Sequence, residues 1–321
     1  MRPSRPVVGL LFILLVFAAA CRSSDAPSGG SPPGGGTAPP SANVEPAAFP
    51  VTITDDDGVE VTIASEPERI VTFAPSMTEI VYALGLGDRL VGVSGPYDDY
   101  PAEAQQVEEV GGAGDFGVDP NLETVVALEP DLFLTISGGD PWKQRLRDLG
   151  VPVATLNATD FADLLDDIRT VGRLTGTASG AELLTTDMQT RADAAAAMAA
   201  GDRVSCFFEV YYPPLTTVGP NTFVYDLLER AGCDPVTAGA TGDYPEWSVD
   251  DLVVGGPQVY LATPESAKSP AAVARRPGFE GIPAVAEGRV ILVDGDLVTR
   301  PGPRVVDGLD QLVAALHAPG D

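Results

Sequence analysis

A long helical pattern at residues 177–200 constrains the fold of this chain more than any other stretch. Its apolar side chains recur every three or four residues and line one helix face; they are Ala181, Leu184, Met188, Ala192, Ala195 and Ala199. Ser179 and Glu182 have the spacing of a capping box at the start, and Gly201 follows the end. A helix of roughly 22 residues spans ~33 Å, about the width of a small domain. The stretch predicts either a rigid connector between two lobes or a long surface helix of one domain.

Short apolar strands alternate with helical segments on both sides of this helix. The expected strands lie at 69–73, 89–93, 132–136 and 151–156 before it, and at 203–211, 258–263 and 289–294 after it. This alternation predicts parallel sheets that helices cover on both faces, so the expected fold class is α/β. Ligands of such sheets bind beyond the carboxyl ends of the strands. That rule points to the loops at 74–76, 96–101 and 137–142.

Local signals add predictions for individual elements. Apolar and polar residues alternate on both sides of Asp57-Gly58, which is typical of a β-hairpin. The expected helix N-terminal signals are the capping box of Ser76 with Glu79 and the caps Asn121 and Ser248. Asp166-Asp167 belongs to a further helical segment, on a face that we expect to be exposed to solvent.

The charge balance excludes some classes of partner. The net charge is −27, from 46 acidic and 19 basic residues, and the only lysines are Lys143 and Lys268. Nucleic acid is excluded as a partner because no basic surface is available to neutralise phosphates. Electrostatic attachment to anionic lipid is excluded for the same reason.

The first 48 residues read as an export and anchoring segment. Residues 1–20 predict a signal peptide, because Arg2 and Arg5 precede an apolar run of about 14 residues, which is too short to span a bilayer. The run leads to Cys21 and resembles a bacterial lipobox, in which the cysteine is diacylated, although Ala18 stands where leucine is usual. Residues 21–48, rich in Gly, Pro and Ser, predict a flexible tether. The alternative is a conventional signal peptide cut near Cys21.

Cys206 and Cys233 are the two remaining cysteines. An exported chain meets an oxidising environment, so this even pair predicts a disulfide, with two buried free thiols as the alternative. Closing a loop of about 27 residues would stabilise the fold by ~3.5 kcal/mol in the chain-entropy model. A metal site is not expected, because His317 is the only histidine and the cysteines lack ligand spacing. The chain also has no GxSxG or phosphate-loop motif, so we predict that it is not an enzyme.

Several segments in order resemble the substrate-binding lipoproteins of ABC importers that take up cobalamin, ferric siderophores and haem. The matching segments are RIVTFAPSMTEIVYALG from Arg69, DYP at 99–101, NLETVVALEPDLFL from Asn121, VGPNTFVYDLLERAG from Val218, EWSVDDLV from Glu246 and RPGPRVVDGLDQLVAALH from Arg300. The DYP and RPGPR segments are most similar to the cobalamin-binding branch. The resemblance implies two Rossmann-like lobes, at 49–176 and 201–321, joined by the helix at 177–200, with the ligand in a cleft between them. It also implies a monomer, without a cofactor, outside the cytoplasm.

The resemblance further implies two docking carboxylates. Members of this family dock on the transporter's membrane subunits through one carboxylate of each lobe, which meets arginines. The matching positions are Glu123 and Asp250. Many relatives carry glutamate at the second position, so Asp251 is an alternative there. Both acids could instead interact only with the dipoles of their own helices.

The ligand residues follow from the same resemblance. A corrinoid is a large, mostly uncharged disc fringed with amides, so it needs flat aromatic surfaces and a few hydrogen-bonding groups. The candidate ligand residues are Tyr97, Phe116, Trp142, Tyr244, Asp296 and Arg300, with Trp247 as a substitute for Tyr244. The aromatic residues could instead pack locally, and Arg300 could cap nearby carbonyls. The alternative ligands are haem or a ferric siderophore; an anionic siderophore would need an arginine cluster, for which Arg300 and Arg304 are available.

Overall fold

Two parallel four-stranded sheets form the framework of the computed structural model, which describes residues 49–111, 119–136, 138, 141–201 and 203–317. The N-terminal sheet has the order β4-β3-β5-β6, with β3 (Ile70–Phe73), β4 (Leu90–Gly92), β5 (Leu132–Thr135) and β6 (Val153–Thr155). The C-terminal sheet has the order β10-β9-β7-β8, with β7 (Val204–Phe208), β8 (Cys233–Pro235), β9 (Val259–Ala262) and β10 (Val290–Leu292). All these strand pairs are parallel. The described residues belong to one compact unit.

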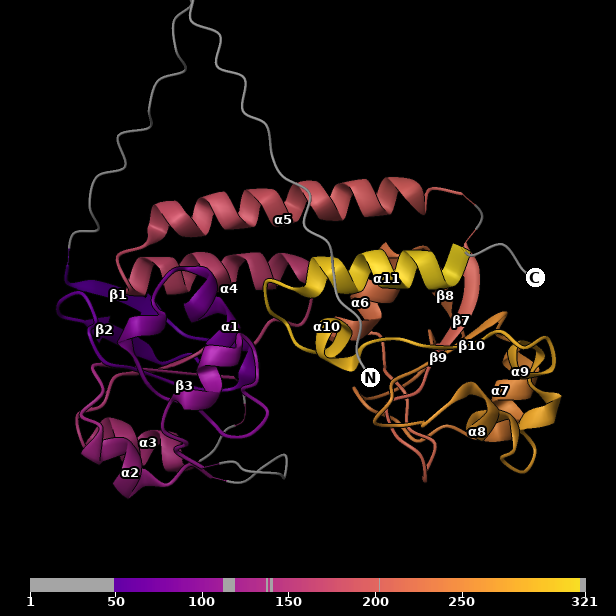
Figure 1. Cartoon of the computed structure of the whole chain (residues 1–321), viewed down its shortest axis with the longest axis horizontal. Coiled ribbons are helices and arrows are strands. Elements are labelled where there is room, and N and C mark those ends of the chain that lie inside the picture. Colours follow the sequence, from indigo (N-terminus) through magenta and orange to yellow (C-terminus); the bar gives the residue numbers. More distant parts are fainter. Residues whose placement is uncertain (1–48, 112–118, 137, 139–140, 202, 318–321) are drawn as a thin grey trace, which may run out of the picture. The chain divides into compact units, whose positions relative to one another are not determined.

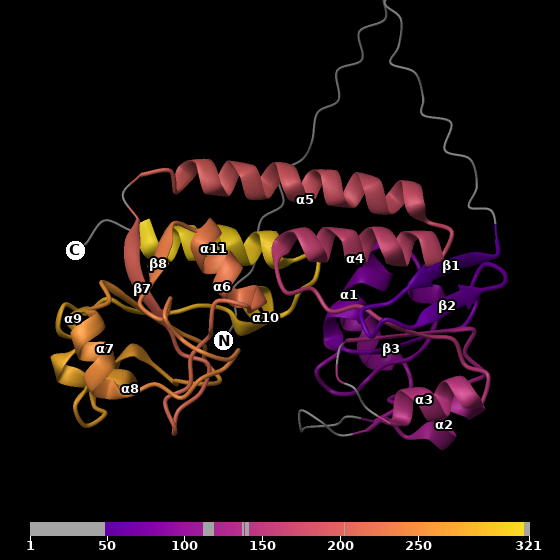
Figure 2. The same ribbon diagram turned by 180° about the vertical axis from the view of Figure 1, so that it is seen from behind.

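Helices surround both sheets (Figures 1 and 2). Those of the N-terminal lobe are α1 (Pro75–Ala83), α2 (Leu122–Ala127), α3 (Pro141–Asp148) and α4 (Phe161–Leu174). Those of the C-terminal lobe are α6 (Phe223–Arg230), α7 (Val249–Gly255), α8 (Pro270–Ala274), α9 (Pro283–Ala286), α10 (Gly295–Thr299) and α11 (Val305–His317). Every residue of β5 and β9 is buried, as expected for strands covered on both faces. The α/β prediction is therefore confirmed.

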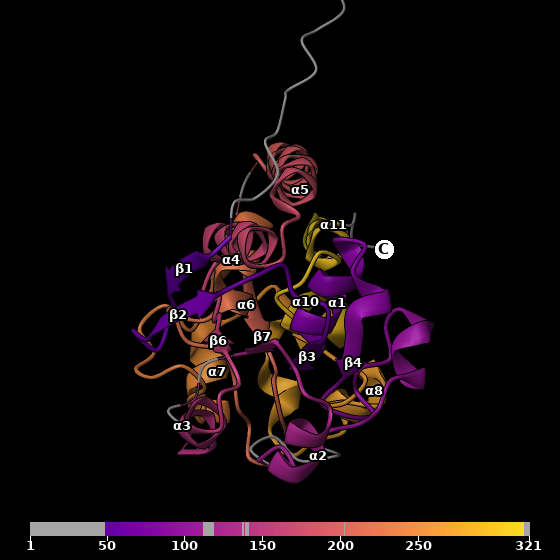
Figure 3. The same ribbon diagram turned by 90° about the vertical axis from the view of Figure 1, so that its left-hand side faces the viewer.

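The predicted long helix is α5 (Ala178–Met198), and it contacts both lobes. It packs against α4 on one side and against α11 and α6 on the other; Figure 3 looks along α5, with α4 and α11 beneath it. Its buried residues are Ala181, Thr185, Met188, Ala192 and Ala195. Four of the six predicted face residues are therefore buried in the helix, while Leu184 is half-buried and Ala199 is the buried C-cap. Arg191 of α5 pairs with Asp307 and Asp310 of α11 at 2.5 and 3.1 Å. The helix thus connects two lobes, each built on its own sheet, within one compact unit.

The predicted capping box at the start of α5 is wrong. Thr177 is the N-cap and its side chain makes no capping hydrogen bond, so Ser179 already lies inside the helix. Glu182 pairs with Arg169 of α4 at 3.1 Å instead of reaching back to the helix start. Arg169 lies thirteen residues away, so the capping pattern alone could not reveal this partner.

The predicted hairpin is confirmed, and its turn anchors it to the N-terminal sheet. Strands β1 (Val51–Thr54) and β2 (Glu60–Ile63) pair antiparallel. The Asp55 carboxylate accepts hydrogen bonds from the Thr155 backbone N–H at the end of β6 and from Arg147, both at 3.1 Å. Asp57 accepts from the Lys143 ammonium at 2.9 Å. Lys143 is only 2% exposed and also donates to the carbonyl of Ile136 and the hydroxyl of Thr155.

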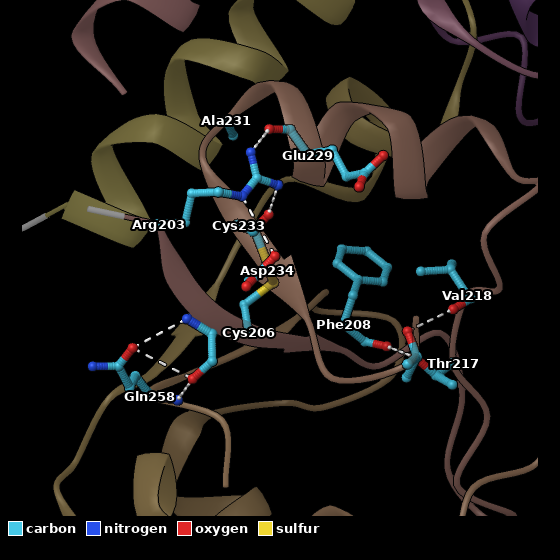
Figure 4. The surroundings of a disulfide bond; sticks show 12 residues. Arg203, Cys206, Phe208, Thr217, Val218, Glu229, Ala231, Cys233, Asp234 and Gln258 are labelled. Atoms are coloured by element: carbon cyan, nitrogen blue, oxygen red, sulfur yellow. Dashed lines mark hydrogen bonds and ion pairs between the residues drawn. A yellow bond between two sulfur atoms is a disulfide. The ribbon is translucent and has the colours of Figure 1, made fainter. Parts of the chain in front are cut away.

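Cys206 and Cys233 form the predicted disulfide in the structure (Figure 4). They lie on the adjacent strands β7 and β8, with 5.8 Å between their Cα atoms, and both are fully buried. The side chain of Arg203 runs beside them and donates to the carbonyl of Cys233. The alternative of two free thiols is therefore not what the structure contains.

Asp167 corrects another prediction, because its side chain is buried rather than solvated. The residue is only 7% exposed on α4, and within the described residues its Oδ2 has no hydrogen-bond partner. Burial, followed by repulsion from Asp56 and Asp163, raises its pKa from 3.8 to about 8. Asp166, its neighbour in sequence, is exposed as predicted, and its carboxylate pairs with Arg169. Hence only one of the two aspartates faces solvent.

We predict that Asp167→Asn stabilises the protein above neutral pH. The native state retains the Asp167 proton up to a pKa of about 8, whereas the unfolded chain loses it near 3.8, so native Asp167 lowers stability progressively as pH rises between these values. The neutral amide removes this loss, so the free energy of unfolding should rise by roughly 5 kcal/mol near pH 8, at about 1.4 kcal/mol per unit of pKa shift, and change little near pH 4. Urea denaturation across this range measures it. Asp166→Asn is the control; an equal pH slope in Asp167→Asn and wild type would contradict the prediction.

Candidate functional site

The loop at 94–101, which follows β4, is held in shape by a buried aspartate. Asp98 is 2% exposed, and its two carboxylate oxygens accept hydrogen bonds from the hydroxyls of Thr78 and Ser94 and from the Gly95 backbone N–H. Burial raises the pKa of Asp98, and the hydrogen bonds from Ser94 and Thr78 oppose that rise. Because Thr78 belongs to α1, Asp98 ties the loop to that helix. The arrangement leaves Tyr97 on the outside, 54% exposed.

A small pocket of about 180 Å³ lies beside this loop, between the end of β4 and the 3₁₀ helix Ala102–Gln106. Pro96, Asp98 and Glu109 contribute to its lining. Pockets that bury drug-sized ligands usually measure about 300 to 1,000 Å³. This pocket is therefore too small for a corrinoid or a haem and is not the predicted ligand cleft.

Arg300 lies among three carboxylates from both lobes. Its guanidinium is 2.7 Å from Asp296 of α10 and 3.0 Å from Asp99 of the loop at 94–101. A third carboxylate, Glu79 of α1, is 3.8 Å away. The Arg300 side chain is 13% exposed, while Asp296 and Asp99 remain more than 40% exposed. The structure thus brings the two predicted polar residues together and adds partners that the sequence analysis did not identify.

Arg304 makes a second, tighter contact between the lobes. Its Nε and Nη2 donate to the two Glu79 oxygens at 3.0 and 2.6 Å, and its guanidinium lies 3.8 Å from the centre of the Tyr100 ring. Glu79 is 3% exposed; burial raises its pKa, and the Arg304 hydrogen bond opposes the rise. The predicted Ser76–Glu79 capping box is therefore wrong. Pro75 begins the helix earlier, with Ala74 as N-cap, so Glu79 is left to face Arg304.

The predicted aromatic residues lie in different environments. Tyr244, between β8 and α7, is 61% exposed. Trp247 packs partly against the C-terminal core, and its indole N–H is buried without a hydrogen-bond partner among the described residues. Trp142 is 3% exposed on α3, where its ring packs edge-on against Phe73 and Phe133, so its placement in a cleft loop is wrong. Phe116 lies outside the described residues.

Glu123 and Asp250 occupy equivalent positions in the two lobes. Each is the second residue of a short helix, α2 or α7, and each is exposed. The predicted caps are confirmed: Asn121 accepts from the backbone N–H groups of Glu123 and Thr124, and Ser248 accepts from that of Asp251. The Asp251 carboxylate in turn accepts from the Ser248 hydroxyl at 2.7 Å, although Asp251 is exposed like Asp250. In Figure 1, both helices lie on the side away from α5.

Other kinds of site were tested against the described part of the chain. Within those ranges, no three His, Cys, Asp or Glu side chains gather in a way that could hold a metal ion. Among the helices described, none combines the length and the apolar character needed to cross a membrane.

Comparison with known proteins decides the family. The model of the family described as "Periplasmic binding protein" matches residues 70–297, which is most of the chain. The chain belongs to this family. As a periplasmic binding protein, it is the substrate-binding component of an ABC importer, works outside the cytoplasm and is not an enzyme.

Two relatives and one solved structure resemble this periplasmic binding protein along most of its length. An ABC transporter substrate-binding lipoprotein of Bacillus subtilis is 36% identical over 84% of this chain and 86% of the relative. A cobalamin-binding protein of Halobacterium salinarum is 32% identical over 95% of this chain and 84% of the relative. The crystal structure of the periplasmic vitamin B12-binding protein of Vibrio cholerae superimposes with a TM-score of 0.69 at 26% identity, covering 78% of this chain and 96% of that one.

The sequence analysis missed most of the charged contacts of this binding protein. It identified Asp296 and Arg300, but it read Glu79 as a capping residue and did not single out Asp98, Asp99 or Tyr100. The available signal was the resemblance of the segments DYP and RPGPR to one branch of the family. These segments are about 200 residues apart, and the structure shows that they contact each other through Asp99 and Arg300.

Proposed function

We propose that this protein captures a corrinoid such as cobalamin and delivers it unchanged to the membrane permease of an ABC importer. The support that carries most weight is the charge around the two arginines. Arg300 and Arg304 provide two positive charges, and Glu79, Asp99 and Asp296 provide three negative ones. The cluster is acidic overall, so it suits a neutral ligand fringed with amides better than an anionic siderophore or the carboxylates of haem.

The exposed tyrosines support the same ligand. Tyr97 and Tyr244, one from each lobe, are both more than half exposed and offer flat rings. Asp296 and Asp99 keep exposed oxygens that can accept hydrogen bonds from amide N–H groups. Trp247 remains the substitute for Tyr244, and Trp142 is not part of the proposed set. The relatives named as cobalamin- and vitamin B12-binding proteins agree with this ligand.

We predict that the purified protein binds cyanocobalamin with a dissociation constant below about 1 μM and gives no binding heat with haemin or a ferric catecholate siderophore. Isothermal titration calorimetry with each of the three ligands measures this. Absence of heat with cyanocobalamin at tens of micromolar, or tight binding of haemin or the siderophore by the wild type, would contradict the proposed ligand.

Two double variants test the charge of this cluster in the same calorimetric titration with haemin. Asp99→Asn/Asp296→Asn makes the cluster positive and should increase the affinity for haemin, because both arginines then exceed the one remaining carboxylate. Asp187→Asn/Asp193→Asn changes the net charge equally on α5 and serves as the control, with no gain expected. Equal haemin binding by the two double variants would show that net charge, not this cluster, governs selection.

We further propose that Glu123 and Asp250 dock the protein on its permease. Both carboxylates are exposed at equivalent positions of α2 and α7, one in each lobe, as the family resemblance requires. Asp251 is a poorer candidate than Asp250, because the Ser248 hydroxyl holds its carboxylate. We also propose that the protein docks on the permease as a monomer.

Glu123→Ala/Asp250→Ala should reduce uptake of radiolabelled cobalamin at least about tenfold, because each buried interfacial charge pair contributes roughly 1.5 kcal/mol or more. The affinity of the purified variant for cyanocobalamin should stay within about twofold of wild type, since neither residue touches the proposed ligand set. Asp251→Ala is the matched control and should retain uptake. Loss of ligand affinity in the double variant would place these residues in the ligand site or the fold instead.

We also propose that a diacylated Cys21 anchors the protein to the membrane, with residues 21–48 as a tether. The relative from Bacillus subtilis is named a lipoprotein, which supports this. Cys21 and the tether lie outside the described residues. Two acyl chains give stable anchoring where a single chain is marginal.

Cys21→Ser should release the protein from membranes into the soluble extracytoplasmic fraction. Fractionation of cells grown with radiolabelled palmitate tests this, because the wild type should carry the label and sediment with membranes. A wild type that carries no label and appears in the soluble fraction would favour a conventional signal peptide.

A further inference from the structure

The contact between Glu79 and Arg304 joins the two lobes at a point far from α5 in the sequence. Glu79 lies on α1, and Arg304 directly precedes α11, 225 residues later. The guanidinium binds both carboxylate oxygens, at 2.6 and 3.0 Å. A planar guanidinium with two parallel hydrogen bonds fixes orientation as well as distance. The pair therefore constrains how the two lobes face each other.

Glu79 is too enclosed to contact a bound ligand. Its side chain is 3% exposed, and both oxygens are engaged by Arg304. The backbone at Gly302 also lies against it: a Cβ atom at Gly302 would come within 3.2 Å of Glu79 Oε2. Whatever Glu79 contributes to binding must therefore act through its neighbours.

The neighbours of the pair are an exposed aromatic ring, Tyr100, and one residue of the proposed ligand set, Arg300. The Tyr100 ring of the N-terminal lobe lies on the Arg304 guanidinium at 3.8 Å, and Tyr100 is itself 45% exposed. Arg300, four residues before Arg304, lies 3.8 Å from the same Glu79 carboxylate. Loss of Glu79 would leave two guanidinium groups with fewer counter-charges and would remove the partner that holds Arg304 beneath Tyr100.

A second contact between the lobes lies in the helical layer. The backbone N–H of Phe161, at the start of α4, donates to Asp226 of α6 at 3.0 Å, and Arg230 lies over the Phe161 ring. This contact involves none of the proposed ligand residues. Within the described ranges, Asp99 also reaches across to Arg300 at 3.0 Å, but it is an exposed carboxylate, whereas the contact of Glu79 with Arg304 is buried and doubly hydrogen-bonded. The contact of Glu79 with Arg304 is therefore the more rigid link between the lobes beside Tyr100 and Arg300.

We propose that Glu79 and Arg304 are positioning residues for ligand capture: as a buried ion pair between the lobes, they hold Tyr100 and Arg300 in place and fix the spacing of the two halves of the site. The identity of the ligand rests on the proposed function, but the positional role does not. It applies to the protein without ligand as well.

The test compares Glu79→Gln with Asp55→Asn in the full-length protein. Asp55 is a suitable control because it also pairs a buried carboxylate with an arginine, with side-chain exposures of 0% and 17% against 3% and 20% for Glu79 and Arg304, but inside a single lobe. Hydrogen–deuterium exchange without ligand should accelerate at both 96–101 and 300–304 in Glu79→Gln and at neither in Asp55→Asn. The affinity for cyanocobalamin should fall about tenfold in Glu79→Gln and stay within about twofold in Asp55→Asn.

The outcomes separate the two proposals. If the wild type binds no cyanocobalamin, the proposed ligand fails, and the exchange measurement alone decides the role of Glu79. If exchange in Glu79→Gln accelerates only around α1, or matches Asp55→Asn at both segments, the positioning role is overturned. Should Glu79→Gln not fold, Arg304→Lys keeps the charge and loses the planar fork, and it should show the same exchange changes with about a fivefold loss of affinity.

Discussion

The close packing of α5 against α4 is the contact on which the two-lobed arrangement depends. Gly172 of α4 meets Ala181 of α5 so closely that a Cβ atom at Gly172 would overlap the Ala181 methyl group. Small residues continue along the buried face of α5 as Ala192 and Ala195. They let a long helix lie flat on helices from both lobes, and no proline interrupts the 21 residues of α5 to kink it. A fixed spacing between the lobes follows from this seam.

Two sets of contacts determine the relative position of the two lobes. The helical layer supplies the spacing through α4, α5, α6 and α11. The charged residues at the ends of the loops supply orientation, because Arg304 and Arg300 of the C-terminal lobe meet carboxylates of the N-terminal lobe. Surfaces held in place in this way lower the cost of binding, because few side chains need to become ordered when a ligand arrives.

Much of the fold could be predicted because its signals are local. The periodicity of α5, the alternation of buried strands and helices, and the caps Asn121 and Ser248 each depend on residues a few positions apart. The failed predictions involve partners that are distant in sequence. Glu79 has the spacing of a capping-box residue, but its carboxylate pairs with Arg304 instead of capping the helix. Glu182 likewise pairs with Arg169 instead of capping α5.

Burial was the other property that local pattern could not supply. Asp167 follows another aspartate and Trp142 follows a proline in a polar segment, yet the carboxyl group and the indole ring are both enclosed by segments from elsewhere in the chain. For the candidate site, the resemblance singled out Asp296 and Arg300, which lie 2.7 Å apart in the structure. It could not show that Asp99 and Glu79 also surround the Arg300 guanidinium and make the cluster acidic overall, which is a property of three-dimensional proximity.

The buried position of Lys143 has a practical consequence for handling the protein. Its ammonium group is engaged by Asp57, the Ile136 carbonyl and the Thr155 hydroxyl. Lys268, the other lysine in the chain, is exposed on the C-terminal lobe. A reagent that couples to primary amines therefore finds one reactive lysine side chain, so apart from the N-terminal α-amino group a dye, a surface or a cross-linker attaches at a single defined residue without mutagenesis.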